Sequence, residues 1–324
     1  MRHRYHDATA ATPPPRLAMT DTTKTALLER YRRITFYPAA NNDAGWIGAV
    51  LARFCPARGR VLDPFCGSAS ISLVAAIEGY EGLASDSNPL TEVFIQMFRG
   101  NERFFAELPI DLAALGDGDA RATAECIYRS DEFEHDAASV HALLYCVSRA
   151  CADGACERGS AMPTYRRAKA DTARFIAELK PYSHALERRL SYRIADVSGI
   201  GIGQHADVCL FDPPYFGRGS FTRFCSPLLA LLGRRMPDDQ ALLADETFYQ
   251  HALSGWLTSC FDALNDDGAI VFTTSPCALE QRRQLLAAAA RLGLNLDQAD
   301  HEGVPYLYAA KLDPREQLRV GNRR

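Results

Sequence analysis

Two proline-containing motifs, each following a short apolar run, constrain the fold of this chain more than any other feature. The run Val208–Phe211 leads into Asp212-Pro213-Pro214-Tyr215, and Arg60–Leu62 leads into Asp63-Pro64-Phe65-Cys66-Gly67-Ser68. Short apolar runs bounded in this way are typical of buried parallel strands. Because ligands of open α/β sheets collect beyond the carboxyl ends of the strands, the two motifs predict one shared active site.

Predicted strands and helices alternate around these motifs. Strands are predicted at Arg60–Asp63, Gly82–Ser85, Tyr192–Ala195, Val208–Phe211, Ala269–Thr274, Leu294–Asp297 and Tyr306–Leu312. Helices are predicted at Lys24–Arg33, Trp46–Phe54, Ser70–Glu78, Glu246–Leu264 and Gln281–Leu292, with turns at Gly79 and Asn265–Gly268. This alternation predicts an α/β fold with a Rossmann-like, doubly wound sheet.

The segment 101–190 breaks the alternation, because it is mostly helical and too long for an ordinary crossover. Irregular stretches are expected at Gly116–Gly118 and Asp153–Thr164. We interpret this segment as a helical insertion between the two motifs. The predicted organisation is a disordered extension (1–22), a cofactor-binding half (23–100), the insertion (101–190), a catalytic half (191–314) and a basic tail (315–324).

The amino-terminal extension is polar and rich in proline, and Met19 is an expected start of translation within it. No apolar run approaches the roughly 20 residues of a membrane span, and the first residues lack the apolar core of a secretory signal. A cytoplasmic protein without a membrane partner is therefore expected. The formal net charge of −4 argues against a uniformly basic surface, although a local basic groove remains compatible with it.

The ten cysteines follow no regular framework, which favours free thiols in a reducing compartment. Cys146, Cys151 and Cys156 recur every five residues near His141. Zinc sites favour closer pairs with a second pair downstream, so no metal site is expected.

The loop after the first predicted strand has the features of a small-molecule site. Gly67 lets backbone approach a ligand closely, and the next helix offers free N–H groups at its start. One glycine flanked by Asp63 and Ser68 suits a zwitterionic amino-acid group better than a diphosphate, whose binding motif is richer in glycine. Asp86, at the end of the second strand, can accept from both hydroxyls of a ribose. The alternative is a plain Rossmann-like loop without a cofactor preference.

Together the two motifs resemble those of bacterial adenine-specific DNA methylases of the DPPY type. The likeness covers Val61–Leu90 and Phe211–Thr274, about a third of the chain, with Ala69 where a second glycine is common. It implies S-adenosylmethionine as cofactor. The cofactor-binding residues then expected are Phe36, Tyr37, Asp63, Pro64, Phe65, Cys66, Gly67, Ser68, Asp86, Ser87 and Asp196. For Phe36 and Tyr37 simple packing is an equal alternative, as is loop capping for Asp196.

The resemblance assigns catalysis to Asp212, Pro213, Pro214 and Tyr215. The Asp212 carboxylate and the Pro213 carbonyl can accept the hydrogens of an exocyclic amine, and the two prolines stiffen that backbone. Tyr215 offers a flat face for a base that has left its stack. Asp212 orients the amine more than it acts as a base, because a carboxylate with a pKa near ~4 matches an arylamine poorly. Transfer is expected to be a direct in-line displacement.

Target recognition is expected in the insertion, where the basic residues could follow phosphates, although a solvated helix face explains them equally well. The nucleic-acid contacts considered are Arg166, Arg167, Lys169, Arg218, Ser220, Phe221 and Arg223, of which Ser220 and Phe221 would line the pocket for a flipped base. Duplex DNA is the expected partner, together with a cognate restriction endonuclease. No oligomeric state is predicted.

The function that these residues favour is methylation of adenine N6 in DNA. The alternatives are a DNA cytosine-N4 methyltransferase, an RNA adenine-N6 methyltransferase, and a nucleic-acid-binding protein whose catalysis is lost. Pro276-Cys277 matches the nucleophile pair of enzymes that methylate cytosine carbon 5, but it follows the wrong strand for that role. Cys277 is therefore interpreted as an inert thiol.

Overall fold

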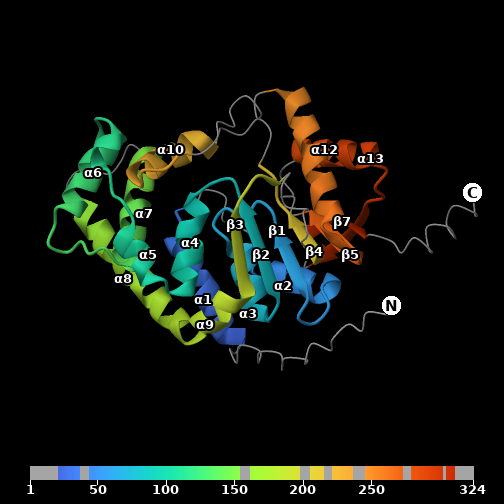
Figure 1. Ribbon diagram of the computed structural model, residues 1–324, viewed down its shortest axis with the longest axis horizontal. Helices are drawn as coiled ribbons and strands as arrows, with labels where there is room; N and C mark the ends of the chain where they lie inside the picture. Colours follow the sequence, from blue (N-terminus) through green and yellow to red (C-terminus); the bar gives the residue numbers. More distant parts are fainter. Residues whose placement is uncertain are drawn as a thin grey trace, which may run out of the picture.

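The computed structural model describes residues 21–36, 44–153, 161–197, 205–214, 221–235, 245–272, 279–301 and 304–310. Its centre is a seven-stranded sheet with the order β3-β2-β1-β4-β5-β7-β6 (Figure 1). The strands are β1 (Arg60–Asp63), β2 (Glu81–Asp86), β3 (Leu190–Ile194), β4 (Ala206–Phe211), β5 (Leu264–Phe272), β6 (Asp297–His301) and β7 (Val304–Ala310). β7 is antiparallel to both of its neighbours, and the pairs from β3 to β5 are parallel. The predicted doubly wound α/β sheet is confirmed.

Alternation along the central strands divides the core between the two faces of the sheet. Val208 and Leu210 of β4 pack with helices α2 (Ala44–Phe54) and α3 (Ser70–Glu78). Cys209 and Phe211 pack on the other face with α12 (Glu246–Asp262) and α13 (Leu279–Arg291). Strands that are covered on both faces are apolar at every position, which explains the continuous apolar run before the second motif.

The helical segment joins α4 (Leu90–Arg99) to β3 and occupies the left-hand side of Figure 1. It consists of α5 (Glu102–Glu107), η1 (Leu112–Leu115), α6 (Asp119–Tyr128), α7 (Ala137–Asp153), α8 (Ala161–Leu179), η2 (Lys180–Tyr182) and α9 (Ser183–Arg189). It shares one buried cluster with α4, α1 (Asp21–Ile34) and α10 (Phe221–Leu231). In that cluster, the ring of Phe175 in α8 stacks on Tyr31 at 5.3 Å and meets Phe98 at 6.2 Å. The segment is therefore packed against the sheet-covering helices through a common core.

Several predicted boundaries are wrong. α1 begins at Asp21, so residues 21 and 22 are helical and not part of a disordered extension. α8 begins at Ala161, within a stretch predicted to be irregular, because Pro163 sits in the first helical turn where proline is tolerated. β3 lies about two residues earlier than predicted, and α4 was not predicted. The expectations for residues 1–20 and 311–324 lie outside the described residues.

Two further corrections concern the carboxyl-terminal strands. β5 begins at Leu264, the predicted end of a helix, and includes the turn predicted at Asn265–Gly268. Ala206 pairs with Leu264 while Val208 pairs with Ala269, so residues 265–268 lie opposite the single residue Asp207 in a bulged ladder. β6 begins at Asp297, where the predicted strand ends, and pairs with β7 as a hairpin. None of the helices in the part of the chain that the structure describes is long and apolar enough to cross a membrane.

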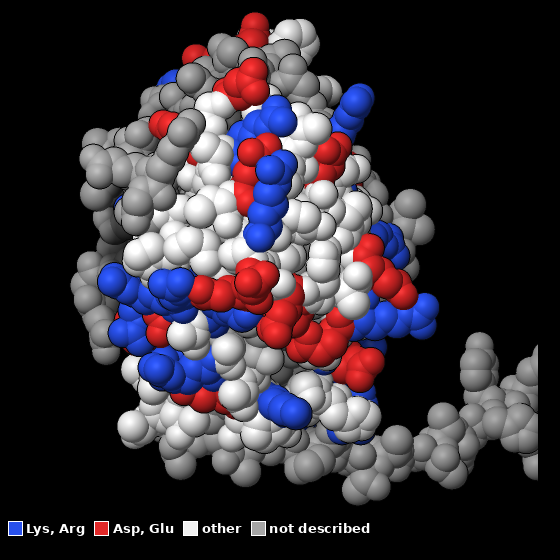
Figure 2. All heavy atoms as spheres, turned by 90° about the vertical axis from the view of Figure 1, so that its left-hand side faces the viewer, with Lys and Arg blue, Asp and Glu red and all other residues white. Residues whose placement is uncertain are grey.

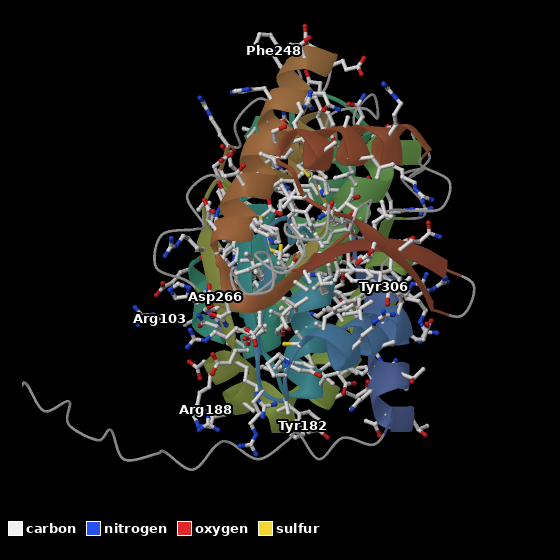
Figure 3. All side chains as sticks on the ribbon, turned by 90° about the vertical axis from the view of Figure 1, so that its right-hand side faces the viewer. Arg103, Tyr182, Arg188, Phe248, Asp266 and Tyr306 are labelled. Atoms are coloured by element: carbon white, nitrogen blue, oxygen red, sulfur yellow. The ribbon has the colours of Figure 1, made fainter. Side chains whose placement is uncertain are left out.

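The shared cluster predicts a large stability effect for Phe175→Ala. Because Phe175 is fully buried, truncation should lower the free energy of unfolding by about 3–5 kcal/mol. Phe248→Ala is the matched control, since Phe248 is 65% exposed at one end of α12 (Figure 3) and should cost less than about 0.5 kcal/mol. Urea unfolding measures both values. Similar losses for the two variants would contradict the shared core.

Candidate functional site

The loop after β1 turns sharply before α3 begins. Gly67 has a φ of 49° and Ala69 a φ of 60°, so both adopt the left-handed conformation. Glycine adopts this conformation freely, whereas Ala69 does so with some strain. The Cys66 N–H donates to the Ser85 carbonyl at 3.1 Å, and Thr91 Oγ1 donates to the Gly67 carbonyl at 2.7 Å. The loop is thus held against β2 and α4.

Asp86, the last residue of β2, holds this loop through its carboxylate. Oδ2 accepts the N–H of Gly67 at 2.7 Å, and Oδ1 accepts the N–H of Asn88 at 2.7 Å. A carboxylate has about four lone-pair directions, so further acceptor capacity remains. The predicted acceptance of ribose hydroxyls by Asp86 is compatible with these two bonds and stays a prediction.

Three aspartates from neighbouring strands meet at the carboxyl edge of the sheet. Asp63 ends β1, Asp86 ends β2 and Asp212 follows β4. Burial raises the pKa of Asp63 to about 7, and the charges of Asp86 and Asp212 raise it as well, against the hydrogen bond from Ser72. Burial raises the pKa of Asp86 to about 6, against its backbone hydrogen bonds. Burial therefore disfavours the ionised forms of Asp63 and Asp86, and repulsion between the carboxylates disfavours that of Asp63 further.

The residues of this edge fit the predicted cofactor. Asp63 is 1% exposed and accepts from Ser72 Oγ at 2.8 Å through Oδ2, while Oδ1 is buried without a hydrogen-bond partner among the described residues. The ammonium and sulfonium charges of S-adenosylmethionine would relieve both this orphaned acceptor and the repulsion between carboxylates. Asp63, the Gly67 loop and Asp86 would hold it, and it would supply a methyl group on a positively charged sulfur.

The motif predicted to be catalytic lies beside this loop because β4 pairs with β1. Asp212, Pro213 and Pro214 are described, whereas Tyr215 lies outside the described residues. The Phe65 ring of the cofactor loop packs edge-on against Phe211 at 5.2 Å, directly before Asp212. The prediction that the two motifs share one edge of the sheet is confirmed.

The other predicted cofactor residues have varied surroundings. Pro64, Cys66 and Ser68 are buried within the loop, and Ser87 is half-buried after β2. Burial raises the pKa of the Cys66 thiol well above its ordinary value, which makes that thiol unreactive. Asp196 is exposed after β3, where the Ala195 N–H donates to the Asp86 carbonyl at 3.1 Å.

Phe36 lies in the core. It is 5% exposed and packs against Phe94 at 4.7 Å and against His141 at 4.9 Å. These contacts favour the packing interpretation over a wall of the cofactor pocket. Burial lowers the pKa of His141 to about 4, so this histidine is neutral near pH 7. Tyr37 lies outside the described residues.

Four side chains that support the two motifs or the helices beside them are not predicted from the sequence. The Tyr31 hydroxyl of α1 donates to the Ser68 carbonyl, and the Tyr249 hydroxyl of α12 donates to the Pro214 carbonyl at 2.9 Å. Asn88 Nδ2 donates to Cys225 Sγ at 3.3 Å, and Arg234 pairs with Glu92 at 2.6 Å. The contact of Asn88 with Cys225 joins the loop after β2 to α10, and the pair of Arg234 with Glu92 joins the turn after α10 to α4. Only tertiary structure reveals these partners, which are far apart along the chain.

The predicted phosphate-tracking residues are engaged within the helical segment. Arg166 donates to both carboxylate oxygens of Glu132, and Lys169 donates to Glu134 at 3.1 Å. Figure 2 shows this side of the molecule, on which Lys and Arg side chains are interspersed with Asp and Glu. This mixed charge favours a solvated helix face for Arg166 and Lys169.

The remaining predicted contacts lie where side chains are not described. Arg218 and Ser220 are outside the described residues, and Phe221 and Arg223 belong to α10 without a description of their side chains. Among the side chains that the structure describes, no group of three or more His, Cys, Asp or Glu could hold a metal. Cys277 and Cys156 are also outside this description.

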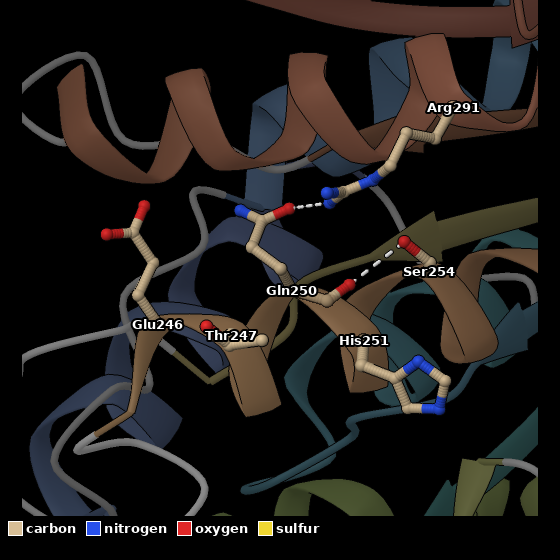
Figure 4. Close-up of a pocket in the computed structure, with 6 residues that line it drawn as sticks. All are labelled: Glu246, Thr247, Gln250, His251, Ser254 and Arg291. Carbon is tan, nitrogen blue, oxygen red and sulfur yellow. Dashed lines mark hydrogen bonds between the residues drawn. The ribbon is translucent and has the colours of Figure 1, made fainter.

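A separate hollow of ≈ 590 Å³ lies against the first half of α12 and the end of α13 (Figure 4). It is lined by Glu246, Thr247, Gln250, His251, Ser254 and Arg291. Arg291 donates to the Gln250 side chain, and Ser254 Oγ donates to the Gln250 carbonyl at 2.9 Å. Gln250, Ser254 and Arg291 are thus bonded to one another, whereas Glu246 accepts from Arg283 and Gln284 outside the lining.

The acidic edge predicts that the cofactor-free protein loses stability as pH rises. An aspartate has a pKa near ~3.9 when unfolded, so the raised pKa values make the folded state bind more protons between about pH 4 and pH 7. The stabilisation is complete below about pH 4 and is lost as pH rises through the folded pKa values of about 6 and about 7. Asp63→Asn should flatten this decline in urea unfolding between about pH 5 and pH 8. The exposed Asp119→Asn should not, and equal slopes for the two variants would contradict the prediction.

The Tyr31 hydrogen bond predicts a cofactor-binding effect for Tyr31→Phe. The variant keeps the buried ring but frees the Ser68 carbonyl, which should weaken binding of S-adenosylmethionine by about fivefold. Equilibrium dialysis measures the dissociation constant. Tyr128→Phe is the control, because it removes a hydroxyl that contacts His135 away from the loop. Equal constants for both variants would show that Tyr31 does not support the loop.

Comparison with solved structures finds methyltransferases of low similarity. They include an S-adenosylmethionine-dependent O-methyltransferase from Thermotoga maritima (TM-score 0.39, 11% identity, covering 88% of this chain and 71% of that chain). TrmN from Thermus thermophilus gives a TM-score of 0.37 and 14% identity over 87% of this chain and 51% of that chain. A TehB-like methyltransferase from Corynebacterium glutamicum gives a TM-score of 0.37 and 13% identity over 90% of this chain and 98% of that chain. No curated protein matches the chain.

The family comparison is decisive. Residues 44–226, more than half of the chain, match the model of the D12 class N6 adenine-specific DNA methyltransferases. The match runs from the start of α2 into α10 and includes both motifs. S-adenosylmethionine is therefore the cofactor, in agreement with the acidic edge. The chain belongs to the family of D12 class N6 adenine-specific DNA methyltransferases.

Proposed function

We propose that the protein transfers a methyl group from S-adenosylmethionine to N6 of adenine in duplex DNA. One observation carries this proposal: Asp212-Pro213-Pro214 follows β4 directly beside the acidic cofactor site at the ends of β1 and β2. This arrangement supports the proposal, because acceptors for an amine would then lie next to the site that fits the methyl donor. The family description supports adenine as the base.

The motif can prepare an exocyclic amine for methylation. The lone pair of such an amine is delocalised into the ring until acceptors hold its hydrogens in the tetrahedral arrangement. The Asp212 carboxylate is one acceptor, and the Pro213 carbonyl is the other, on a backbone that proline has already fixed. Tyr215 follows at once and offers an aromatic face for a flipped base. Positioning is thus the main contribution of the protein, and no covalent link to the chain is needed.

We further propose that the helical segment 101–190 recognises the target, with a cofactor-binding half (23–100) and a catalytic half (191–314) on either side. The Asp111 N–H of this segment donates to the Leu231 carbonyl at 2.7 Å, next to the end of α10. The segment therefore adjoins the chain that follows the catalytic motif. Arg167 is exposed on the same helix as the paired Arg166 and Lys169 and is the better placed to meet a phosphate.

Two other enzymes would use the same acceptors. Cytosine N4 is also an exocyclic amine, so a cytosine-specific DNA enzyme would need the same geometry with a different pocket. An RNA methyltransferase would favour loops and single strands, where bases are already unstacked. A binding protein without catalysis would have no need for Asp212 and Gly67, both of which are present.

The proposal is tested by transfer of tritiated methyl to unmethylated duplex DNA, followed by nucleoside mass spectrometry. N6-methyladenine should form, and Asp212→Asn should lower its rate by at least about 100-fold, because a neutral amide with one acceptor oxygen replaces a charged carboxylate with two. Asp262→Asn is the control, since Asp262 is exposed at the end of α12.

The other outcomes are equally informative. N4-methylcytosine would keep the mechanism and overturn the base. Label in RNA but not in DNA would overturn the substrate. Label in neither, or full activity of Asp212→Asn, would overturn the proposed function.

A further inference from the structure

We infer that Tyr249 is a positioning residue for the catalytic motif, through its hydroxyl on the Pro214 carbonyl. The inference rests on the proposed function and adds a residue that lies outside the matched family region. The hydrogen bond spans 2.9 Å and joins α12 to the motif. Tyr249 is fully buried and Pro214 is half-buried, so the donor side of this bond is shielded from water.

The hydroxyl of Tyr249 has a fixed place because its helix is anchored one turn earlier. The Asp245 side chain caps α12, accepting from the N–H groups of Thr247 at 2.8 Å and Phe248 at 3.0 Å. The Tyr249 N–H donates to the Asp245 carbonyl at 2.9 Å. A capped helix start and a packed ring leave the hydroxyl little freedom.

The surroundings of the Tyr249 ring connect both halves of the site. The ring meets Trp256 edge-on at 6.5 Å, and Trp256 meets Phe65 of the cofactor loop at 5.1 Å. Tyr249 also shares a buried cluster with Phe211, the residue before Asp212. The donor is therefore held by the same core that positions the two motifs.

The hydroxyl of Tyr249 supplies a contact that the motif's own backbone offers few ways to make. Pro213 and Pro214 have no N–H groups, so their carbonyls are the only backbone groups through which these two residues can be held by hydrogen bonds. The carbonyl that Tyr249 holds belongs to the planar peptide bond between Pro214 and Tyr215. Fixing that plane sets the direction in which the chain continues into Tyr215, whose ring would support the target base. The bond also satisfies a carbonyl that the fold partly buries.

Tyr249→Phe tests the inference, because it removes the hydroxyl and keeps the ring. With S-adenosylmethionine and duplex DNA, kcat should fall by about tenfold, while KM for either substrate stays unchanged. Thr258→Val is the matched control on the same helix, since its exposed hydroxyl bonds only within α12, to the Ser254 carbonyl at 2.9 Å. It should leave kcat unchanged.

A second measurement separates positioning from general damage to the fold. If Tyr249 acts through Tyr215, Tyr249→Phe should lower the single-turnover rate of methyl transfer by a much smaller factor in the Tyr215→Ala variant than in the wild-type protein. Additive losses, a rise in either KM value, or a kcat equal to that of Thr258→Val would overturn the inference. A wild-type protein that methylates no DNA would instead overturn the proposed function, so the two failures are distinguishable.

Discussion

The rest of the site depends on two hydrogen bonds that the buried carboxylate of Asp86 accepts. Its two oxygens bind the N–H of Gly67 from the loop after β1 and the N–H of Asn88 from the loop after β2. Thr91 completes the connection by donating to the Gly67 carbonyl. These charge-assisted bonds add to the strand pairing and to the bond from the Cys66 N–H to the Ser85 carbonyl. Because the two loops carry most of the predicted cofactor-binding residues, Asp86 helps to set the mutual position of those residues.

The parallel strands also bring acidic side chains together, which raises the electrostatic energy of the site. The carboxyl ends of β1, β2 and β4 share one edge, so Asp63, Asp86 and Asp212 raise the electrostatic energy of the cofactor-free protein. A cation at this edge offsets that energy, which links cofactor affinity to the protonation of Asp63. Under the proposed function, the same arrangement would leave Asp212 beside the methyl donor, so binding and catalysis would use one set of charges.

Two buried tyrosines support the motifs from helices outside the family region. Tyr31 of α1 donates to the Ser68 carbonyl of the cofactor loop, and Tyr249 of α12 donates to the Pro214 carbonyl of the catalytic motif. They belong to different buried clusters, so each motif is supported from its own part of the core. In both cases a hydroxyl satisfies a loop carbonyl that has no strand partner. In this chain both motifs are thus supported by contacts from helices that flank the matched family region.

The sequence by itself determined the local elements and the chemistry of the loops. Alternation and glycine placement were sufficient to predict β1, α3 with its Gly79 cap, and the shared edge of the two motifs. Tertiary structure alone decided the bulge at residues 265–268, the pairing of Arg166 with Glu132, and the tyrosine donors. The physical reason is that the periodic spacing of apolar residues indicates which face of a single helix or strand is buried. A hydrogen bond between two elements depends instead on how distant segments of the chain pack together.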